Sequence, residues 1–158
     1  MISIIVAIAN NNVIGKNNQL PWYYKNDLKH FKDITTNHTV VMGRNTFDSI
    51  ILRNSKPLPN RKNVVVTRNV DFKYPDVVVI NDFLEYLKEN HKEEIFIIGG
   101  NQIYKESLPY ANRLYITHIK KDHEGDIYFP EYEKEDFELI KKNDAGELSF
   151  CVYERISR

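Results

Sequence analysis

Residues Ile2–Ala9 form an almost unbroken apolar run, which constrains the fold more than any other stretch of the chain. A strand buried on one face alternates apolar and polar residues, whereas a strand buried on both faces is apolar throughout. Strands of the second kind are typical of parallel sheets that helices cover from both sides. The run therefore predicts an interior strand of a mostly parallel sheet.

The chain continues as alternating strand and helix patterns. Short apolar runs predict further strands at Thr39–Met42, Asn63–Thr67, Val77–Ile80 and Glu94–Ile98. Apolar residues at helical spacing predict helices at Asp27–Thr36, from Gly43 to about Ile51, after an N-cap at Asn81 or Asp82, and at Gln102–Leu108. The third of these helices carries Phe83, Leu84 and Leu87 on its apolar face, and Pro109 ends the fourth.

The pattern changes after Arg113. Antiparallel strands are predicted at Leu114–Ile119, Phe137–Lys142 and Leu148–Ile156, the last two joined by a turn at Asn143–Gly146. The expected fold is therefore α/β, with a mostly parallel central sheet of about eight strands, an antiparallel C-terminal edge and about four flanking helices. We expect residues 1–158 to form one domain.

Two connections stand out between these elements. Residues Asn10–Tyr24 form a long connection with Gly15 in its middle, and connections of that length in a small domain are usually functional or mobile. Residues Leu52–Lys62 are basic and contain two prolines, so they too predict a loop.

The composition excludes several classes of protein. Basic and acidic residues balance at 22 each, so no overall charge favours binding to nucleic acid or to an anionic membrane. No apolar run is long enough to span a membrane, and the N-terminus lacks the features of a signal peptide. The single cysteine, Cys151, excludes an internal disulfide and fits a reducing compartment. We therefore expect a cytoplasmic protein, and nothing in the sequence requires more than a monomer.

Glycines and cations follow several of the predicted strands. Parallel sheets of α/β proteins bind ligands at the carboxyl ends of their strands. Those ends carry Gly43-Arg44-Asn45-Thr46, Thr67-Arg68 and Gly99-Gly100-Asn101-Gln102. Backbone N–H groups at a helix N-terminus lack helical partners and attract anions. The arrangement favours a ligand with several phosphates, such as a dinucleotide with an extra ribose phosphate, although neither GxGxxG nor a Walker loop is present.

Asp27 permits two interpretations. It lies in the first turn of a predicted helix, where the helix dipole favours an acid for purely structural reasons. It also lies at the edge of the apolar stripe of Leu28 and Phe31, shortly after Trp22. A single carboxylate among aromatic side chains can bind a flat, nitrogen-rich cation or a pair of donors. The histidines are scattered without ligand spacing, so no metal site is expected.

A set of motifs identifies a family. The motifs are Ile14-Gly15, Leu20-Pro21-Trp22, Asp27-Leu28 with Phe31, Met42-Gly43-Arg44-Asn45-Thr46-Phe47, Pro57-Leu58-Pro59-Asn60-Arg61, Val66-Thr67-Arg68, Ile98-Gly99-Gly100 through Tyr104, and Thr117. In this order and spacing the chain resembles the dihydrofolate reductases of the bacterial chromosomal type, from Met1 to about Arg155. The resemblance implies NADPH-dependent reduction of 7,8-dihydrofolate to tetrahydrofolate, the precursor of one-carbon carriers. It also implies competition by diaminopyrimidine or pteridine antifolates.

The resemblance assigns substrate and catalytic roles. Asp27 resembles the pterin-binding carboxylate with Thr117 beside it, and Arg61 resembles the arginine that pairs with the glutamate α-carboxylate of folate. Catalytic roles are implied for Asp27, Leu20, Trp22 and Thr117. Substrate contacts are implied for Ile5, Val6, Ala7, Asp27, Leu28, Phe31, Ile50, Leu58, Arg61, Ile98, Tyr104 and Thr117. The proton at N5 is implied to arrive through water, while NADPH supplies a hydride to C6.

The resemblance also assigns the NADPH contacts. Residues Ile14 to Leu20 resemble the mobile loop that closes over nicotinamide and substrate, and Gly99-Gly100 resembles a cis glycine pair beside the pyrophosphate. The implied cofactor contacts are Ala7, Ile14, Gly15, Asn18, Gln19, Leu20, Gly43, Arg44, Asn45, Thr46, Thr67, Arg68, Ile98, Gly99, Gly100, Asn101, Gln102, Ile103 and Tyr104.

Some residues depart from the family pattern. Asn60 stands where glycine is common, and Asn101 where a third small residue is common. The loop Leu52–Lys56 is longer than in compact members, which leaves Arg53 and Lys56 open as substrate contacts. Gln102 lacks a positive charge that some members have, so Arg44 and Arg68 are the expected partners of the 2′-phosphate. Two alternatives stay open: an NADPH-dependent reductase of a pyrimidine in riboflavin synthesis, and a catalytically silent nucleotide- or folate-binding protein.

Overall fold

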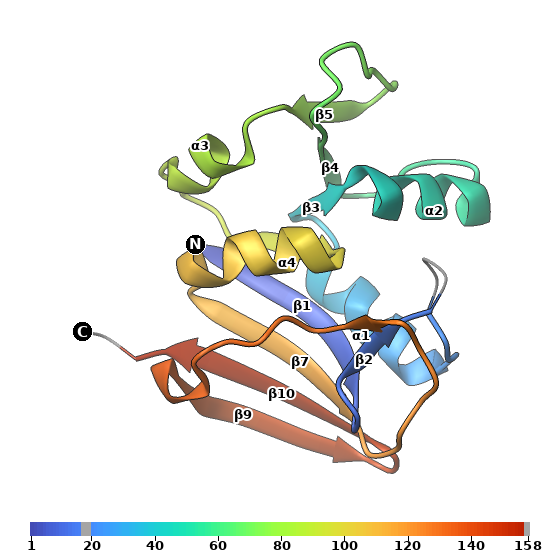
Figure 1. Ribbon diagram of the computed structural model, residues 1–158, viewed down its shortest axis with the longest axis vertical. Helices are drawn as coiled ribbons and strands as arrows, with labels where there is room; N and C mark the ends of the chain where they lie inside the picture. Colours follow the sequence, from blue (N-terminus) through green and yellow to red (C-terminus); the bar gives the residue numbers. More distant parts are fainter. Residues whose placement is uncertain (17–19, 157–158) are drawn as a thin grey trace.

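A single twisted sheet organises the molecule (Figure 1). The computed structural model describes residues 1–16 and 20–156. Within them the sheet has eight strands in the order β5-β4-β3-β6-β1-β7-β10-β9. Its strands are β1 (Ile2–Ala9), β3 (Thr39–Gly43), β4 (Lys62–Val66), β5 (Val77–Ile80), β6 (Ile95–Gly99), β7 (Arg113–Ile119), β9 (Phe137–Ala145) and β10 (Leu148–Arg155).

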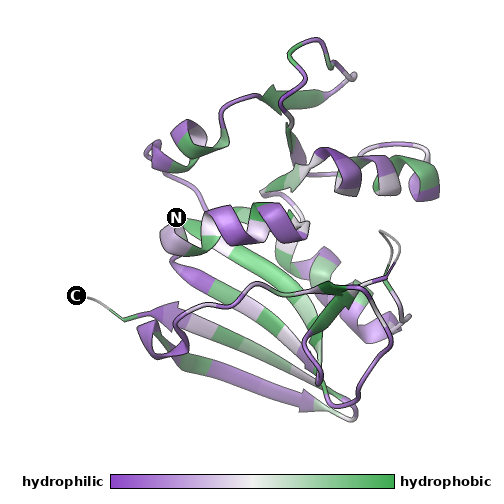
Figure 2. Cartoon of the chain, viewed as in Figure 1, coloured by the Kyte–Doolittle hydropathy of each residue, from purple (hydrophilic) through white to green (hydrophobic). Residues whose placement is uncertain are grey.

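β1 lies in the middle of the sheet, parallel to β6 on one side and to β7 on the other. Ile4 is fully buried and Ile5 nearly so, although they point to opposite faces of the sheet. The apolar run at the start of the sequence is therefore an interior strand, as predicted. Figure 2 shows β1 as hydrophobic along its length, in contrast to the largely hydrophilic edge strand β9.

Helices cover both faces of the sheet. The helices are α1 (Lys25–Thr35), α2 (Arg44–Asn54), α3 (Phe83–Lys88) and α4 (Asn101–Ser107). Phe83 of α3 and Ile103 of α4 pack with Ile4 on one face. Phe47 of α2 packs with Ile5 on the other face, where Phe31 of α1 joins the same cluster. Each face of the central strands thus has its own apolar core.

The C-terminal edge is antiparallel, as predicted. β10 runs antiparallel to both β7 and β9. The predicted turn at Asn143–Gly146 is misplaced, because β9 continues to Ala145 and Asn143 pairs with Phe150. The chain reverses at Gly146, whose φ of +63° suits a residue without a side chain. Cys151 is buried in β10.

A second, two-stranded sheet was not predicted. β2 (Val13–Gly15) pairs antiparallel with β8 (Ile127–Tyr128), so the connection Asn10–Tyr24 is not wholly irregular. β2 is only three residues long and follows three asparagines, so no periodicity marked it. Short 3-10 turns at Leu108–Tyr110 and Lys134–Asp136 complete the regular structure described.

Two helix predictions need correction. α2 is predicted to end at about Ile51, but it extends to Asn54. The sequence does not reveal its last turn, because that turn is exposed and does not continue the apolar pattern; Leu52 is 82% exposed. Ser55, with φ 64°, ends α2 by donating its N–H to the Ile51 carbonyl at 2.8 Å. Leu84 was placed on the buried face of α3, but it is exposed and only Phe83 and Leu87 are buried.

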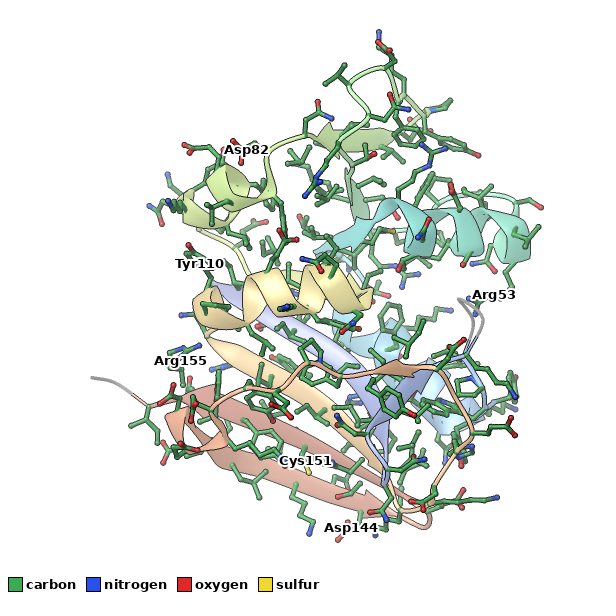
Figure 3. All side chains as sticks on the ribbon, viewed as in Figure 1. Arg53, Asp82, Tyr110, Asp144, Cys151 and Arg155 are labelled. Carbon is green, nitrogen blue, oxygen red and sulfur yellow. The ribbon has the colours of Figure 1, made fainter. Side chains whose placement is uncertain are left out.

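Asp82, one of the two predicted capping residues, caps α3. Its carboxylate accepts the Glu85 N–H at 3.1 Å, whereas the Asn81 amide donates to the Thr67 carbonyl at 2.8 Å. Asp82 is labelled at the start of α3 in Figure 3. No helix in the described part of the chain combines the length and the apolar character needed to cross a membrane.

Candidate active site

Asp27 projects from the first turn of α1 toward β7. Tyr24 precedes the helix in an extended conformation and makes no side-chain cap, so Asp27 is the acidic residue of the first turn. Its carboxylate is half-buried and accepts a hydrogen bond from the Thr117 hydroxyl. Burial raises the pKa of Asp27, and the Thr117 bond opposes this shift in part. The residue is therefore both a first-turn acid and a desolvated carboxylate beside the sheet.

A cavity of about 400 Å³ opens over this carboxylate. Its walls combine aromatic and aliphatic side chains from α1, α2 and the segment before α1. The lining residues are Leu20, Trp22, Tyr23, Tyr24, Asp27, Leu28, Ser49, Leu52 and Arg53. Leu20, Trp22 and Leu28 are thus brought to Asp27, as the sequence motifs required. Phe31, Ile50 and Leu58 lie together in the adjoining apolar cluster.

The α2 contribution to the cavity was largely missed. Ser49, Leu52 and Arg53 are spaced by three and four residues, so they share one face of a helix. A helix that ends at about Ile51, as the sequence predicts, does not include Leu52 and Arg53. Figure 3 shows Arg53 near the end of α2 on the side of α1. Lys56, the other uncertain contact, is not among the residues that line this cavity.

Arg61 is held at the C-terminal end of α1. Its Nη1 donates to Thr35 Oγ1 at 3.1 Å, and its Nε donates to the Pro59 carbonyl at 2.9 Å. The guanidinium carbon lies 5.9 Å from the centre of the Phe31 ring. Partial burial lowers the pKa of Arg61, but an arginine stays charged at neutral pH. A fixed cation therefore lies one helix length from the Asp27 carboxylate.

The ends of β3 and β6 meet beside Thr46. The Gly99–Gly100 peptide bond is cis, and α4 begins directly after it. A side chain at Gly99 or Gly100 would come within 3.6 Å of Thr46 Oγ1. At Gly43 a Cβ would lie only 3.1 Å from Ile103 Cγ1. Small residues thus keep the backbone of both strand ends bare, and a hydroxyl group stands next to them.

Tyr104 connects this region to β1. Its hydroxyl donates to the Ile5 carbonyl at 2.9 Å, and its ring is 5% exposed. Burial raises the pKa of Tyr104, with a smaller contribution from the negative charge of Asp27. The charge of Asp27 therefore reaches Tyr104, whose hydroxyl holds α4 to the middle of β1.

Two arginines follow neighbouring strands at the same edge. Arg44 follows β3, where its Nε donates to Asp48 Oδ1 at 3.0 Å and its guanidinium carbon lies 4.0 Å above the Phe72 ring. Arg68 follows β4 and is exposed. β3 and β4 pair in parallel with Gly43 opposite Val66, so both arginines start from the same end of the sheet. Thr67 directly precedes Arg68, and its hydroxyl accepts the Asn69 N–H at 3.2 Å.

The β2–β8 sheet fixes the segment that leads to the cavity. Gly15 accepts the Asp126 N–H at 3.1 Å, and Ile14 is buried. Gly125 fits tightly there, because a Cβ would lie 2.6 Å from the Gly15 carbonyl oxygen. Asn18 and Gln19, which the resemblance assigns to the cofactor, lie outside the described residues.

His123 belongs to the site, although no spacing in the sequence marks it. Its ring lies 4.9 Å from the Trp22 ring, and its Nε2 is 3.0 Å from the Tyr24 hydroxyl. Tyr24 also bonds the Glu147 carboxylate; burial and this partner raise the pKa of Tyr24 to about 12. The Trp22 indole N–H is buried and finds no acceptor among the described residues. His123 therefore packs against two aromatic residues that line the cavity.

Comparisons with known proteins agree over nearly the whole chain. The family model for dihydrofolate reductase matches residues 1–155. Dihydrofolate reductase of Bacillus subtilis (strain 168) is 41% identical, covering 98% of this chain and 95% of that protein. The Staphylococcus aureus enzyme is 45% identical over 87% of this chain and 83% of its own length.

The structural comparison gives the same result. Dihydrofolate reductase from Enterococcus faecalis, solved in complex with NADP(H) and RAB-propyl, superposes with a TM-score of 0.88. The two chains are 33% identical, and the match covers 99% of this chain and 97% of that one. The fold, the motifs and these matches lead to one conclusion. The chain belongs to the dihydrofolate reductase family.

Proposed function

We propose that Asp27 is the group that binds and activates the substrate in this reductase. Family membership gives the reaction: the chain transfers a hydride from NADPH to 7,8-dihydrofolate and forms 5,6,7,8-tetrahydrofolate. The observation that supports the role of Asp27 is its half-buried carboxylate, bonded to Thr117 and facing a cavity lined by Trp22 and Leu28.

The geometry suits a pterin. The N3–H and 2-amino groups of a pterin form a pair of parallel donors, which a carboxylate accepts bidentately. Leu28, Phe31, Ile50 and Leu58 would enclose the pteridine and aminobenzoyl rings, and Arg61 would pair with the α-carboxylate of the glutamate. The pterin would also be bordered by residues of β1 and β6, which are Ile5, Val6, Ala7 and Ile98, and by Tyr104 of α4. The buried Trp22 N–H would donate to the substrate or to a water bound with it.

The strand ends fit the NADPH phosphates. The bare backbone at Gly43 and Gly99–Gly100 lets a large group approach where a Cβ would intrude, and the Thr46 hydroxyl stands beside it. Arg44 and Arg68 would bind the 2′-phosphate, because guanidinium groups match phosphate geometry. Ile14, Gly15 and Leu20, with Asn18 and Gln19 of the same segment, would cover the nicotinamide. Asn45, Thr67, Asn101, Gln102 and Ile103 complete the proposed set. When bound, NADPH supplies the hydride.

The protein's own contribution is to orient the reactants and to favour positive charge on the pterin. Asp27 is an anion in a largely apolar wall, so it stabilises protonation of the ring more strongly than it would in water. Because the carboxylate would be bonded to N3 and the 2-amino group, the N5 proton would come through water. The segment around Leu20 would exclude bulk water during the transfer.

We also infer where and how the protein works. Residues 1–158 would act as one domain, since all of the described strands but β2 and β8 belong to one sheet. The single buried cysteine suits a reducing compartment, so we propose a cytoplasmic location. We also propose a monomer, because the proposed site uses residues of one chain. Diaminopyrimidine and pteridine antifolates should compete with dihydrofolate, since they offer Asp27 similar donors.

One substitution tests the role of Asp27. Asp27→Asn removes the charge and points a donor at the pterin's donors. Absorbance at 340 nm with NADPH and dihydrofolate should show activity in the wild type. Single-turnover hydride transfer should be slow in the variant at pH 7 and rise as pH falls, because the variant must use substrate protonated in solution. Asp33→Asn, on the same helix, is the control and should keep wild-type rates.

Other outcomes point elsewhere. A variant with wild-type hydride transfer near pH 7 would leave Asp27 only a structural role, as an acid in the first turn of α1. A wild type that binds both ligands but oxidises no NADPH would instead be a silent binding protein. Activity with the riboflavin-pathway pyrimidine in place of dihydrofolate would reassign the substrate.

A further inference from the structure

A second hollow lies behind α1, on the side away from Asp27. One wall is formed by α1 and the floor by β7, β10 and β9. Its volume is about 580 Å³, against about 400 Å³ for the cavity over Asp27. The lining residues are Asn26, Lys29, His30, Asp33, Ile34, Arg113, Tyr115, Ile140, Lys141, Asn143, Phe150 and Val152. We call this the α1–β9 groove; its size is in the range of sites for small organic ligands.

The floor of the groove is apolar and aromatic. Phe150 and Val152 project from β10 on the same face, and Tyr115 projects from the neighbouring β7 opposite Val152. The His30 ring of α1 lies 4.4 Å from the Phe150 ring at an angle of 35°. Burial, with the positive charge of Lys141 opposing protonation, lowers the pKa of His30 despite Asp33. A neutral aromatic surface therefore forms the base of the groove.

The rim of the groove is cationic. The lining residues include three cations, Lys29, Arg113 and Lys141, but only one carboxylate, Asp33. Two of the cations are already paired: Lys29 Nζ lies 2.6 Å from Asp33 Oδ2, and Arg113 Nη2 lies 3.3 Å from Glu154 Oε1. Among residues 1–16 and 20–156, Lys141 forms no ion pair. One ammonium group is thus left beside an aromatic floor.

We propose that the α1–β9 groove binds a planar aromatic monoanion, an aromatic carboxylate or sulfonate. The rings would lie against Phe150 and Val152, and the anionic group would pair with Lys141. A cationic ligand would be repelled by the excess positive charge of the rim. A polyanion would find only one unpaired cation here. The site is separate from the substrate cavity, because Asn26, Lys29 and Asp33 line one side of α1 while Asp27 and Leu28 line the other.

A fluorescent aromatic sulfonate, whose naphthalene ring is planar, tests the proposal. 8-Anilino-1-naphthalenesulfonate is titrated into the full chain while NADP⁺ and a tight-binding diaminopteridine saturate the active site. We expect one equivalent to bind under these conditions, at low ionic strength where charge interactions are least screened. Backbone amide shifts in NMR spectra should change in residues 26–34 and 141–152. Loss of all binding when the active site is saturated would overturn the proposal.

Charge variants give the sharper result. Lys141→Glu replaces an attraction with a repulsion and should raise the Kd roughly 10- to 30-fold, the factor expected when the sign of an exposed pair about 4 Å apart is reversed. Lys142→Glu is the matched control, because Lys142 is the next residue of the same exposed strand and points to the opposite face. It should leave the Kd unchanged.

An uncharged probe completes the design. N-Phenyl-1-naphthylamine has the same rings without the sulfonate, so it should bind more weakly and respond equally to Lys141→Glu and Lys142→Glu. If the two lysine variants affect the sulfonate equally, or if the uncharged probe binds as tightly as the anion, the pairing with Lys141 is wrong. Both substitutions are on exposed side chains, so the variants should fold.

Discussion

Replacing Arg61 with alanine should weaken dihydrofolate binding without affecting NADPH. In the structure two N–H groups of Arg61 already donate, one to Thr35 Oγ1 and one to the Pro59 carbonyl. These bonds fix the guanidinium plane beside Phe31 and leave its other N–H groups for a ligand. The proposed partner is the α-carboxylate of the glutamate tail. An alanine would leave that carboxylate without a cation.

The size of the effect follows from the burial of Arg61. Truncating one partner of a fully desolvated charge pair costs about 2–5 kcal/mol. A fully exposed pair is worth about 0.2–1 kcal/mol. Arg61 is half-buried, so the lower end of the first range applies. We expect a loss of about 2 kcal/mol, which corresponds to a roughly 30-fold rise in the KM for dihydrofolate.

Steady-state kinetics with each substrate varied in turn measures this loss. Arg53→Ala is the matched control, because Arg53 also lines the substrate cavity but is exposed, so its removal should change the KM less than about fivefold. Urea unfolding should confirm that the lost bond to Thr35 leaves the variant folded. An equal rise in the KM for NADPH would refute the assignment. So would an equal loss with a dihydropterin that lacks the glutamate.

Three further predictions concern the charge of Asp27, the loop contacts and the cofactor. Burial raises the pKa of Asp27, so the folded state binds its proton more tightly than the unfolded state and loses stability as pH rises through the folded pKa. Asp27→Asn should therefore gain stability relative to wild type between acidic and neutral pH in urea unfolding; an advantage that shrinks with rising pH would contradict this. Gly125→Ala should cost about 1–3 kcal/mol of stability, because its Cβ would overlap the β2 backbone and the Val13 side chain, and a silent substitution would show that the loop yields easily. Replacing Arg44 and Arg68 together by alanine should raise the KM for NADPH but not for NADH, and an unchanged preference would move the 2′-phosphate site elsewhere.

The sequence was sufficient wherever apolar periodicity or a motif marked the element. The unbroken run from Ile2 to Ala9 and the alternation of strands and helices predicted the layers of the fold. The family resemblance implies a shared site for Asp27, Leu28 and Trp22, and the structure brings them together around one cavity. These features are local in the chain, so a single sequence contains them.

The remaining features depend on contacts between distant segments. The last turn of α2 contains no buried residue, and β2 is too short to show a period. His123 meets Trp22 and Tyr24 across a separation of about 100 residues, which no spacing in the sequence signals. The α1–β9 groove exists because the floor strands come from the C-terminal third of the chain and the wall from its beginning.

The central position of β1 sets an order of events during synthesis. Of the eight strands in the sheet, β1 is synthesised first, yet its partners in the sheet begin at Ile95 and Arg113. Its backbone therefore stays unpaired until most of the chain has been made, and the contacts that close the sheet are long-range ones, which form slowly. Asp27 likewise waits for Thr117 on β7. A nascent chain that stops before β7 would display an apolar strand and an incomplete site, which makes it a natural client for chaperones.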